Sequence, residues 1–352
     1  MKFGLSFLPD VTEDQLTAAR YFADVAGLCK WGESVGFDYV KMTEHYMHAY
    51  GGFCPSPLTF LSWIGAQTKS IRLLTGCVIP SFHHPVELAS HTTMVDALTE
   101  GRLEVGFARG YLPHEFDTFG INMDTSSRRF EESVQAVIRL WTERGVTLRT
   151  PFFSFDDVTI LPRPTQASLP PFWIAAVKSR RSFERAGILG ANLLINPSVT
   201  RGDIDNISTY RDAFRSHHPN KLPRVAASVP VFVNADSNEA RLVADEYLRK
   251  YLKVWASATS AWGNRTSSSY AAYTGMSRFI GSLTAKDLRL SGSAIVGDPV
   301  EVSAKIRSFQ QLLGVDVMLC QVDYGGMPAD LARASMELFA REVMPEFRSN
   351  EE

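Results

Sequence analysis

The sequence contains few cysteines and no long apolar run. Its four cysteines are far apart and form no CxxC pair; they are Cys29, Cys54, Cys77 and Cys320. Such spacing favours reduced thiols over a disulfide framework or a zinc site. No apolar stretch is long enough to cross a bilayer, and the N-terminal segment turns acidic after one short apolar run, unlike a signal peptide. We therefore expect a cytoplasmic globular protein.

Neither sign of charge is in excess. The 36 Lys and Arg residues are balanced by 38 Asp and Glu residues, which gives a formal net charge of -2. This balance does not favour binding to nucleic acid or to an anionic membrane surface. The sequence also lacks repeats of 20–50 residues and low-complexity tracts. We expect neither nucleic acid nor a membrane as a partner.

What the sequence does have is an alternation of short apolar runs with longer segments of helical period. The candidate strands are Lys2–Phe7, Asp38–Met42, Ile71–Ile79, Arg102–Ala108, Pro171–Ala176, Ala191–Ile195, Val225–Val233 and Val315–Val322. Strands separated by helices indicate parallel βα units, and eight is the number that a (β/α)8 TIM barrel needs. We predict one such α/β barrel domain over residues 1–352. A doubly wound open sheet is the alternative, although no GxGxxG motif follows the first strand.

One long segment, Ser257–Phe279, interrupts the pattern before the last strand. It is rich in Ser, Gly and Thr, yet it carries the large side chains of Trp262, Tyr270 and Tyr273. Loops of this length in compact domains are commonly active-site lids or disordered segments. We predict a lid-like insertion that is mobile when the site is empty and packs over it when a ligand binds.

Polar residues follow several of the predicted strands. Because the active site of a barrel lies at the carboxyl ends of its strands, these residues are the candidates for chemistry. His45 and Glu44 follow the second strand, and His45 is a candidate catalyst. Arg109 and the pair Lys178-Ser179 follow the fourth and fifth strands, where they predict a site for an anionic group such as phosphate.

Each candidate also has a structural interpretation. His45 fits an ordinary structural histidine, and Arg109 fits a salt bridge to a carboxylate such as Glu115. A metal site is a further alternative, with Glu44 and the histidine pairs His45/His48 or His83/His84 as ligands. The other strand ends lack the carboxylates that usually complete a barrel metal site, so we expect no metal.

Several segments, in order along almost the whole chain, carry a family resemblance. They include "GFDYVKMTEHYMHAYG", "GRLEVGFARGYLPHEFDTFGINMDTSSRRFEE", "PRPTQASLPPFWIAA", "VNADSNEARLVADEYL" and "IVGDPVEVSAKI". In these segments the chain resembles the bacterial luciferase-like flavin-dependent monooxygenases.

The resemblance implies a (β/α)8 barrel that uses reduced FMN (FMNH2) and O2 to oxygenate an organic, largely apolar substrate through a C4a-peroxyflavin. It also implies a separate flavin reductase as the source of FMNH2, and a homodimer packed through the first helices of the barrel. Two alternatives stay open at this point. One is an F420-dependent oxidoreductase on the same barrel, and the other is a flavin-binding subunit without catalysis.

The resemblance assigns roles to individual residues. His45 falls at the position of the catalytic histidine, and Gly76-Cys77 falls where several members have a non-prolyl cis peptide under the isoalloxazine ring. The cofactor-binding positions implied are Gly76, Cys77, Ala108, Arg109, Arg128, Ala176, Lys178 and Ser179, with Arg129 as a rival to Arg128.

Two positions depart from the family pattern. The second family histidine is replaced by Tyr46, and the acid-serine pair of the luciferase phosphate loop is replaced by Val177-Lys178. These departures argue against the light-emitting reaction on long-chain aldehydes, but they leave the flavin chemistry in place.

Overall fold

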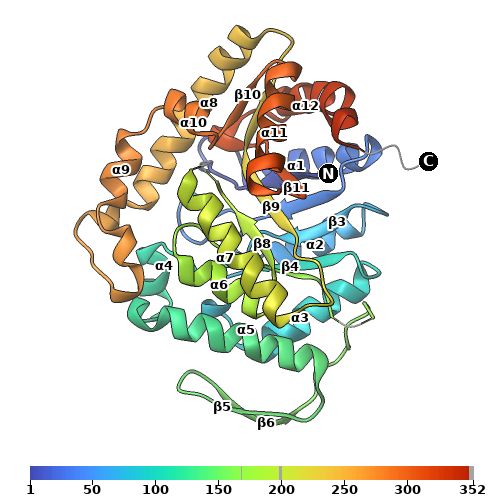
Figure 1. Ribbon diagram of the computed structural model, residues 1–352, viewed down its shortest axis with the longest axis vertical. Helices are drawn as coiled ribbons and strands as arrows, with labels where there is room; N and C mark the ends of the chain where they lie inside the picture. The colour runs from blue at the N-terminus through green and yellow to red at the C-terminus, as the bar shows by residue number, and fades with distance from the viewer. Residues whose placement is uncertain (168, 198–199, 349–352) are drawn as a thin grey trace.

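The computed structural model describes residues 1–167, 169–197 and 200–348. Its main sheet has nine parallel strands in the order β10-β9-β11-β1-β2-β3-β4-β7-β8, and β8 also pairs with β9. This additional pairing closes eight of the strands into the predicted barrel and rules out the open-sheet alternative (Figure 1). The barrel strands are β1 (Lys2–Phe7), β2 (Tyr39–Met42), β3 (Arg72–Thr75), β4 (Leu103–Phe107), β7 (Phe172–Ala175), β8 (Asn192–Ile195), β9 (Val225–Val233) and β11 (Val317–Gln321).

Helices surround the barrel. The α-helices are α1 (Ala18–Ser34), α2 (Pro57–Gly65), α3 (Pro85–Leu98), α4 (Pro113–Thr118), α5 (Ser126–Thr142), α6 (Arg180–Ile188), α7 (Arg201–His217), α8 (Ser237–Ala258), α9 (Met276–Ser282), α10 (Ala285–Ser291), α11 (Pro299–Leu313) and α12 (Ala329–Leu338). Shorter helical turns are η1 (Pro80–Phe82), η2 (Met123–Thr125), η3 (Ser260–Gly263), η4 (Ser268–Tyr273), η5 (Tyr324–Gly326), η6 (Phe339–Val343) and η7 (Met344–Phe347).

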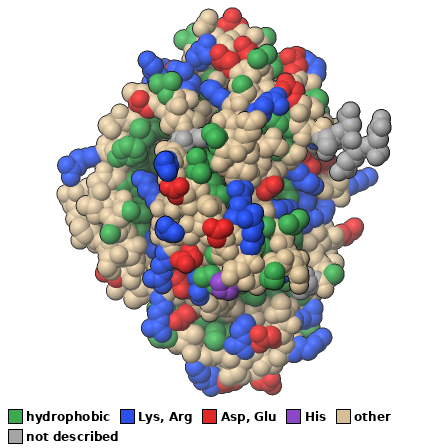
Figure 2. Space-filling model, viewed as in Figure 1, with side chains coloured by type: hydrophobic (Ala, Val, Ile, Leu, Met, Phe, Trp, Pro, Cys, Tyr) green, Lys and Arg blue, Asp and Glu red, His purple; other side chains and the backbone are tan. Residues whose placement is uncertain are grey.

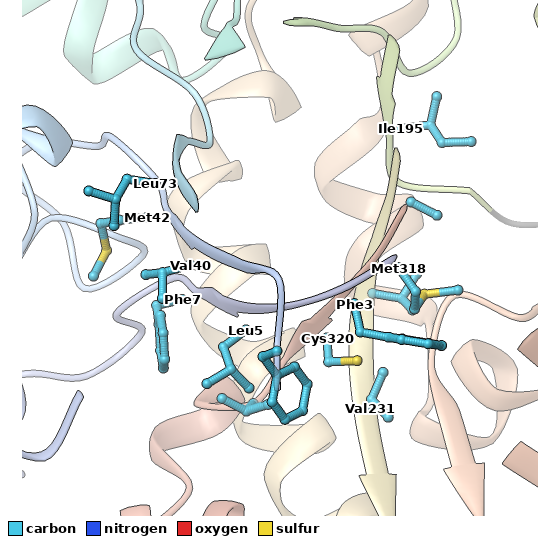
Figure 3. Packing of buried hydrophobic residues seen from close by; sticks show 14 of the residues in the cluster. Phe3, Leu5, Phe7, Val40, Met42, Leu73, Ile195, Val231, Met318 and Cys320 are labelled. Carbon is cyan, nitrogen blue, oxygen red and sulfur yellow. The ribbon is translucent and has the colours of Figure 1, made fainter. Parts of the chain in front are cut away.

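Alternation along the strands separates the interior of the barrel from the layer that packs against the helices. On β1, Phe3, Leu5 and Phe7 belong to the large core outside the barrel. Figure 3 shows Phe3 and Leu5 beside Cys320 of the neighbouring strand β11. Such alternation is what a period of two along a strand predicts. The intervening residues of β1 therefore face the barrel axis.

The interior is filled by a second, smaller cluster. It contains Tyr39, Leu74, Cys77, Trp173, Leu194, Ala226, Val317 and Leu319. Gly4 is needed here, because a Cβ at this position would lie 2.6 Å from the Cβ of Tyr39 and 2.7 Å from Cδ2 of Leu319. The lower and middle parts of the barrel are thus packed core, and a ligand can enter only from the mouth.

The third strand is shorter than predicted. β3 ends at Thr75 rather than at Ile79, because the chain leaves the ladder at the cis peptide between Gly76 and Cys77. Val78 then rejoins the sheet in an isolated bridge to Phe107. The segment that follows the third strand therefore begins inside the predicted strand.

Three further elements differ from the prediction. Residues 146–158 form an antiparallel hairpin, β5 (Val146–Arg149) and β6 (Ser154–Val158), which lies beyond α5 at the bottom of Figure 1. A short strand, β10 (Ile295–Gly297), pairs with the carboxyl end of β9, at Val231–Val233. The segment Ser257–Phe279 is not irregular: it continues from α8 into η3, η4 and the start of α9.

The surface is mixed in charge and the cysteines are buried. Lys and Arg side chains are interspersed with Asp and Glu over the face in Figure 2. All four cysteines are free thiols inside the protein. Among the described residues, none of the helices is long and apolar enough for a membrane span.

Candidate active site

His45 is held at the mouth of the barrel by a buried carboxylate. Its Nδ1 lies 2.9 Å from Oε1 of Glu115, which also accepts a hydrogen bond from the backbone N–H of Tyr46. Both side chains are buried. A carboxylate beside Nδ1 keeps the proton on that nitrogen and leaves Nε2 as the acceptor. Among the described residues no hydrogen bond to Nε2 is found, so this nitrogen is available to a ligand.

Glu44, the neighbour of His45, is the centre of a separate hydrogen-bond network. Its Oε1 accepts hydrogen bonds from the hydroxyl of Tyr46, at 2.8 Å, and from Nε2 of His83, at 3.0 Å. Its Oε2 accepts from the backbone N–H of Ile79. Burial and the Glu44 carboxylate raise the pKa of the Tyr46 hydroxyl. Glu44 therefore joins the loops after β2 and β3, and Tyr46 belongs to this network.

The cis geometry predicted for Gly76-Cys77 is confirmed. The hydroxyl of Thr43 donates to the carbonyl of Gly76 at 2.9 Å, and the backbone N–H of Glu44 donates to the carbonyl of Cys77 at 3.3 Å. The carbonyl groups of both Gly76 and Cys77 are thus held by residues that directly follow β2. Its contact with a cofactor stays a prediction.

Arg109 lies beyond β4 and is not paired with Glu115. Its guanidinium lies 4.0 Å from the centre of the Tyr270 ring, and the Tyr270 hydroxyl donates to the carbonyl of Gly110 at 2.7 Å. Within the described part of the chain, no carboxylate forms an ion pair with Arg109. Its charge is therefore held by an aromatic ring and is free to meet an anion.

A pocket of about 310 Å³ opens beside Arg109. Its lining residues are Arg109, Ser127, Phe130, Glu131, Ile174, Ala175, Ser179, Arg181, Ser182, Arg185, Ser268 and Ser269. Ser179 is the N-cap of α6, where unpaired backbone N–H groups favour an anion. Nε of Arg185 is buried and has no hydrogen-bond partner. Arginines, serine hydroxyls and a helix N-terminus together fit a phosphate group.

Of the predicted cofactor positions, Arg109 and Ser179 line this pocket; Gly76 and Cys77, described above, and four others do not. Arg128 points outward, with 66% of its side chain exposed, and pairs with Glu132 at 2.6 Å. The Lys178 ammonium lies 5.5 Å from the centre of the Phe279 ring. Ala176 is buried, and its backbone N–H donates to the carbonyl of Leu194 in the barrel ladder. The backbone N–H of Ala108 likewise donates a hydrogen bond to the carbonyl of Val78.

Sequence reasoning missed Arg185, Ser268 and Ser269. Arg185 lies inside a predicted helix, but its spacing of four from Arg181 places both cations on one face of α6. The two serines belong to the segment interpreted as a lid, so that segment also forms a wall of the pocket.

The Ser257–Phe279 segment is tied to the loop after β4. Asp124 accepts from the Ser267 hydroxyl at 2.6 Å and from the backbone N–H of Ser268 at 2.8 Å. Arg265 forms a two-bond ion pair with Asp117. These contacts correct the expectation that little holds the segment in one conformation. Asp117, Asp124 and Arg265 also line a second pocket of about 420 Å³, and each of these charges already has a partner there.

The metal alternative lacks a ligand cluster. His83 faces Glu44, whereas Nδ1 of His84 accepts from the backbone N–H of Val86 at the start of α3. In residues 1–167, 169–197 and 200–348, no three His, Cys, Asp or Glu side chains gather as a metal ion would need.

Comparison with known proteins identifies a family. Residues 1–316 match the model of the luciferase-like monooxygenases. The chain is 25% identical over 361 residues to the oxygenase component of a flavin-dependent trigonelline monooxygenase from Acinetobacter baylyi, with 99% of this chain and 96% of that protein covered.

Solved structures share the fold. The monooxygenase RslO1 from Streptomyces bottropensis superposes with a TM-score of 0.87 at 33% identity, covering 99% of this chain and 100% of the other. The oxygenating constituent of 3,6-diketocamphane monooxygenase from Pseudomonas putida, a type II Baeyer–Villiger enzyme in complex with FMN, has a TM-score of 0.78 at 18% identity. It covers 98% of this chain and 99% of its own, and at that identity it supports the fold alone.

Proposed function

The chain belongs to the luciferase-like monooxygenase family, and from this premise we propose that it is a flavin-dependent monooxygenase that binds reduced FMN and oxygenates an organic substrate with O2. The observation that carries the proposal is the arrangement of three features at one mouth. These are the His45–Glu115 pair, the cis peptide Gly76-Cys77 and the arginine-serine pocket beside Arg109.

The pocket fits the phosphate of FMN. Within the described residues Arg109 supplies an unpaired charge, and Ser179 is the N-cap of α6. Arg185 lies 3.6 Å from Glu131 through one guanidinium nitrogen, but its buried Nε lacks an acceptor that a phosphate oxygen would supply. The Gly76-Cys77 peptide, two strands away, would support the ring. When bound, the reduced flavin supplies two electrons to O2, so that one oxygen atom enters the substrate and the other leaves as water.

His45 would serve as a general acid and base in the reaction. Glu115 holds its Nδ1, so the other nitrogen, Nε2, can take a proton from the bound reactants and return it. The Tyr50 ring, 5.2 Å away, and the Tyr111 ring, 6.2 Å away, flank the imidazole. This aromatic surrounding lowers the access of water, which a site that activates oxygen requires.

The lid segment would complete the site from above. Tyr270 stacks on Arg109, and Ser268 and Ser269 line the same pocket. The lid segment would therefore close over the flavin ring when the phosphate of FMN binds in the pocket. An organic substrate with apolar area would occupy the space that remains at the mouth.

Two partners belong to the proposal. One is a flavin reductase that supplies FMNH2, since the matched relative from Acinetobacter is named as an oxygenase component. The other is a second copy of the chain. Helices α2 and α3 pack together and expose Trp63, Met94 and Leu98, whose burial a homodimer through the first helices would explain.

The test compares cofactors on the purified protein. Anaerobic titration should give tight binding of FMNH2, and bound FMNH2 should release H2O2 more slowly than free FMNH2 when O2 is admitted. Addition of an oxidisable organic compound should lower the H2O2 yield further. Tight binding of F420H2, with its oxidation coupled to reduction of a substrate, would instead support the F420 alternative. Flavin that binds but reacts with O2 as free flavin does would indicate a subunit without catalysis.

A further inference from the structure

A row of polar side chains crosses three neighbouring strands inside the barrel. Ser6 of β1 is paired in register with Lys41 of β2 on one side and with Gln321 of β11 on the other. All three alternate with residues that pack outward, so they face the barrel axis. The layer beneath them, two residues earlier on each strand, is Tyr39, Gly4 and Leu319. The row is therefore the first polar layer above an apolar plug.

The row borders the mouth. Lys41 and Gln321 are each 7% exposed, as is Ser228 of β9, whereas Tyr39 and Leu319 beneath them are 0% exposed. The greater exposure of Lys41, Gln321 and Ser228 than of the layer beneath indicates that the polar side chains form the floor of the open end. A ligand that enters the barrel from the mouth would meet them first.

The Lys41 ammonium lacks a counter-ion. Its Nζ donates to the hydroxyls of Ser6 at 3.1 Å, Thr43 at 3.4 Å and Ser228 at 3.4 Å. Among the described residues, no carboxylate forms an ion pair with it. Burial lowers the pKa of Lys41 to about 8, although Asp323 acts in the opposite direction from a distance. A buried cation whose partners are only neutral hydroxyls is costly unless an anion reaches it.

Gln321 presents a second unused donor. Its Nε2 is buried and has no hydrogen-bond partner. The two ends of the row thus carry N–H groups that need acceptors, one of them positively charged. Buried donors in a folded protein are almost always paired, and unpaired ones point to a missing partner. A planar acceptor with negative charge would satisfy both ends.

The proposed ring position lies directly beside Lys41. A Cβ on Gly76 would lie 2.1 Å from Cε and 2.2 Å from Cγ of Lys41, so the lysine chain runs along the inner side of the cis peptide. Thr43, a partner of the Lys41 ammonium, also donates to the Gly76 carbonyl. The cation therefore lies on the barrel side of the peptide that would support the flavin.

We propose that Lys41, with Ser6 and Gln321, binds the negatively charged edge of the reduced flavin ring, so that the protein selects reduced over oxidised FMN. This inference rests on the proposed function. Two electrons and one proton convert the neutral oxidised ring into a reduced ring whose negative charge is shared by N1 and the C2 carbonyl oxygen. A cation and an amide donor stabilise that edge much more strongly after reduction, because the edge then carries negative charge. An enzyme that collects FMNH2 from solution needs this selection, because oxidised FMN carries the same phosphate.

The experiment measures the ratio of two dissociation constants. Oxidised FMN and FMN reduced with dithionite are titrated anaerobically into wild type, Lys41→Met and Gln321→Leu. Wild type should bind reduced FMN more tightly than oxidised FMN. Lys41→Met should lower this preference by about 10- to 100-fold, the value of a charge-assisted hydrogen bond, with the affinity for oxidised FMN nearly unchanged. Gln321→Leu should lower it by about twofold to tenfold.

Lys305→Met is the matched control. Lys305 is a half-buried lysine whose Nζ donates to the carbonyl of Val296, away from the mouth, so its replacement should leave both affinities unchanged. An unchanged preference in Lys41→Met, or equal losses for oxidised and reduced FMN, would overturn the inference alone. Failure of wild type to bind FMN in either state would overturn the proposed function as well.

Discussion

Nδ1 of His45 lies 2.9 Å from Oε1 of Glu115, and this pair joins the end of β2 to α4, which follows β4. Oε2 of Glu115 is buried without a partner, so the carboxylate serves the imidazole and the backbone of Tyr46. A histidine oriented in this way has one nitrogen fixed and one free. The pair is the basis of the first prediction.

Glu115→Gln should lower oxygenation by about 10²- to 10⁴-fold and leave FMN affinity within about threefold of wild type. The glutamine amide favours the wrong tautomer of His45, so the loss should fall on kcat and should alter its pH profile. Glu115→Asp keeps a carboxylate and should lose less. Steady-state rates across pH measure this. Equal losses in the glutamine and aspartate variants would argue against a role in orienting His45.

Arg109→Ala and Arg185→Ala should weaken FMN binding by about 1.5–3 kcal/mol and riboflavin binding much less. The reason is that both arginines line the pocket that fits a phosphate, which riboflavin lacks. Arg128→Ala and Lys178→Ala are matched controls, because these cations lie outside the pocket. Fluorescence titration gives the affinities. If Arg128→Ala costs more FMN affinity than Arg109→Ala, the phosphate lies elsewhere.

Replacement of residues 266–274 by a short Gly-Ser bridge should leave the barrel folded, since no strand is removed. It should weaken FMN binding, because Ser268 and Ser269 are lost from the pocket and Tyr270 no longer stacks on Arg109. It should also divert reduced FMN to H2O2, because water reaches the ring. Tyr270→Phe keeps the ring over Arg109 and should show a smaller effect. Product formed per FMNH2 is the measurement, and a wild-type yield from the bridged protein would contradict the lid assignment.

Asp10 predicts a pH dependence of stability. Burial, together with the nearby Asp323 carboxylate, raises the pKa of Asp10 to about 8. An unfolded chain loses this proton near pH 4, so between about pH 4 and pH 8 the folded state binds more protons than the unfolded state. The free energy of unfolding should therefore fall as pH rises through this range. Asp10→Asn should flatten the fall, whereas the exposed control Asp330→Asn should not. Urea unfolding at several pH values measures this dependence. Equal slopes of unfolding free energy against pH in Asp10→Asn and wild type would refute the prediction.

The sequence predicted the barrel strands well, because short buried runs between helices leave few other interpretations. Val225–Val233 was predicted at its observed bounds, and most others were off by one or two residues. β10 was missed because three residues are too short for a period to register, and the hairpin β5–β6 because its strands are largely exposed.

His45 and Arg109 are predicted site residues because they follow strands, a property of position along the chain, and their roles stay predictions. Glu115 entered the sequence analysis only as an alternative ion-pair partner of Arg109, whereas tertiary packing places it on His45. Lys41 was not predicted as a site residue, because it lies inside an apolar run and only closure of the barrel reveals which side chains share its interior.

The central claim is that the protein transfers an oxygen atom from O2 to an organic substrate by means of reduced FMN. The most direct measurement incubates the protein with a panel of organic compounds, FMNH2 from a reductase and ¹⁸O2, and analyses the products by mass spectrometry. The account predicts a product with a single ¹⁸O atom, formed by wild type and almost absent with His45→Ala, whose FMN affinity should be largely intact. Labelled H2O2 as the sole product across the panel, or equal labelling by His45→Ala, would contradict it.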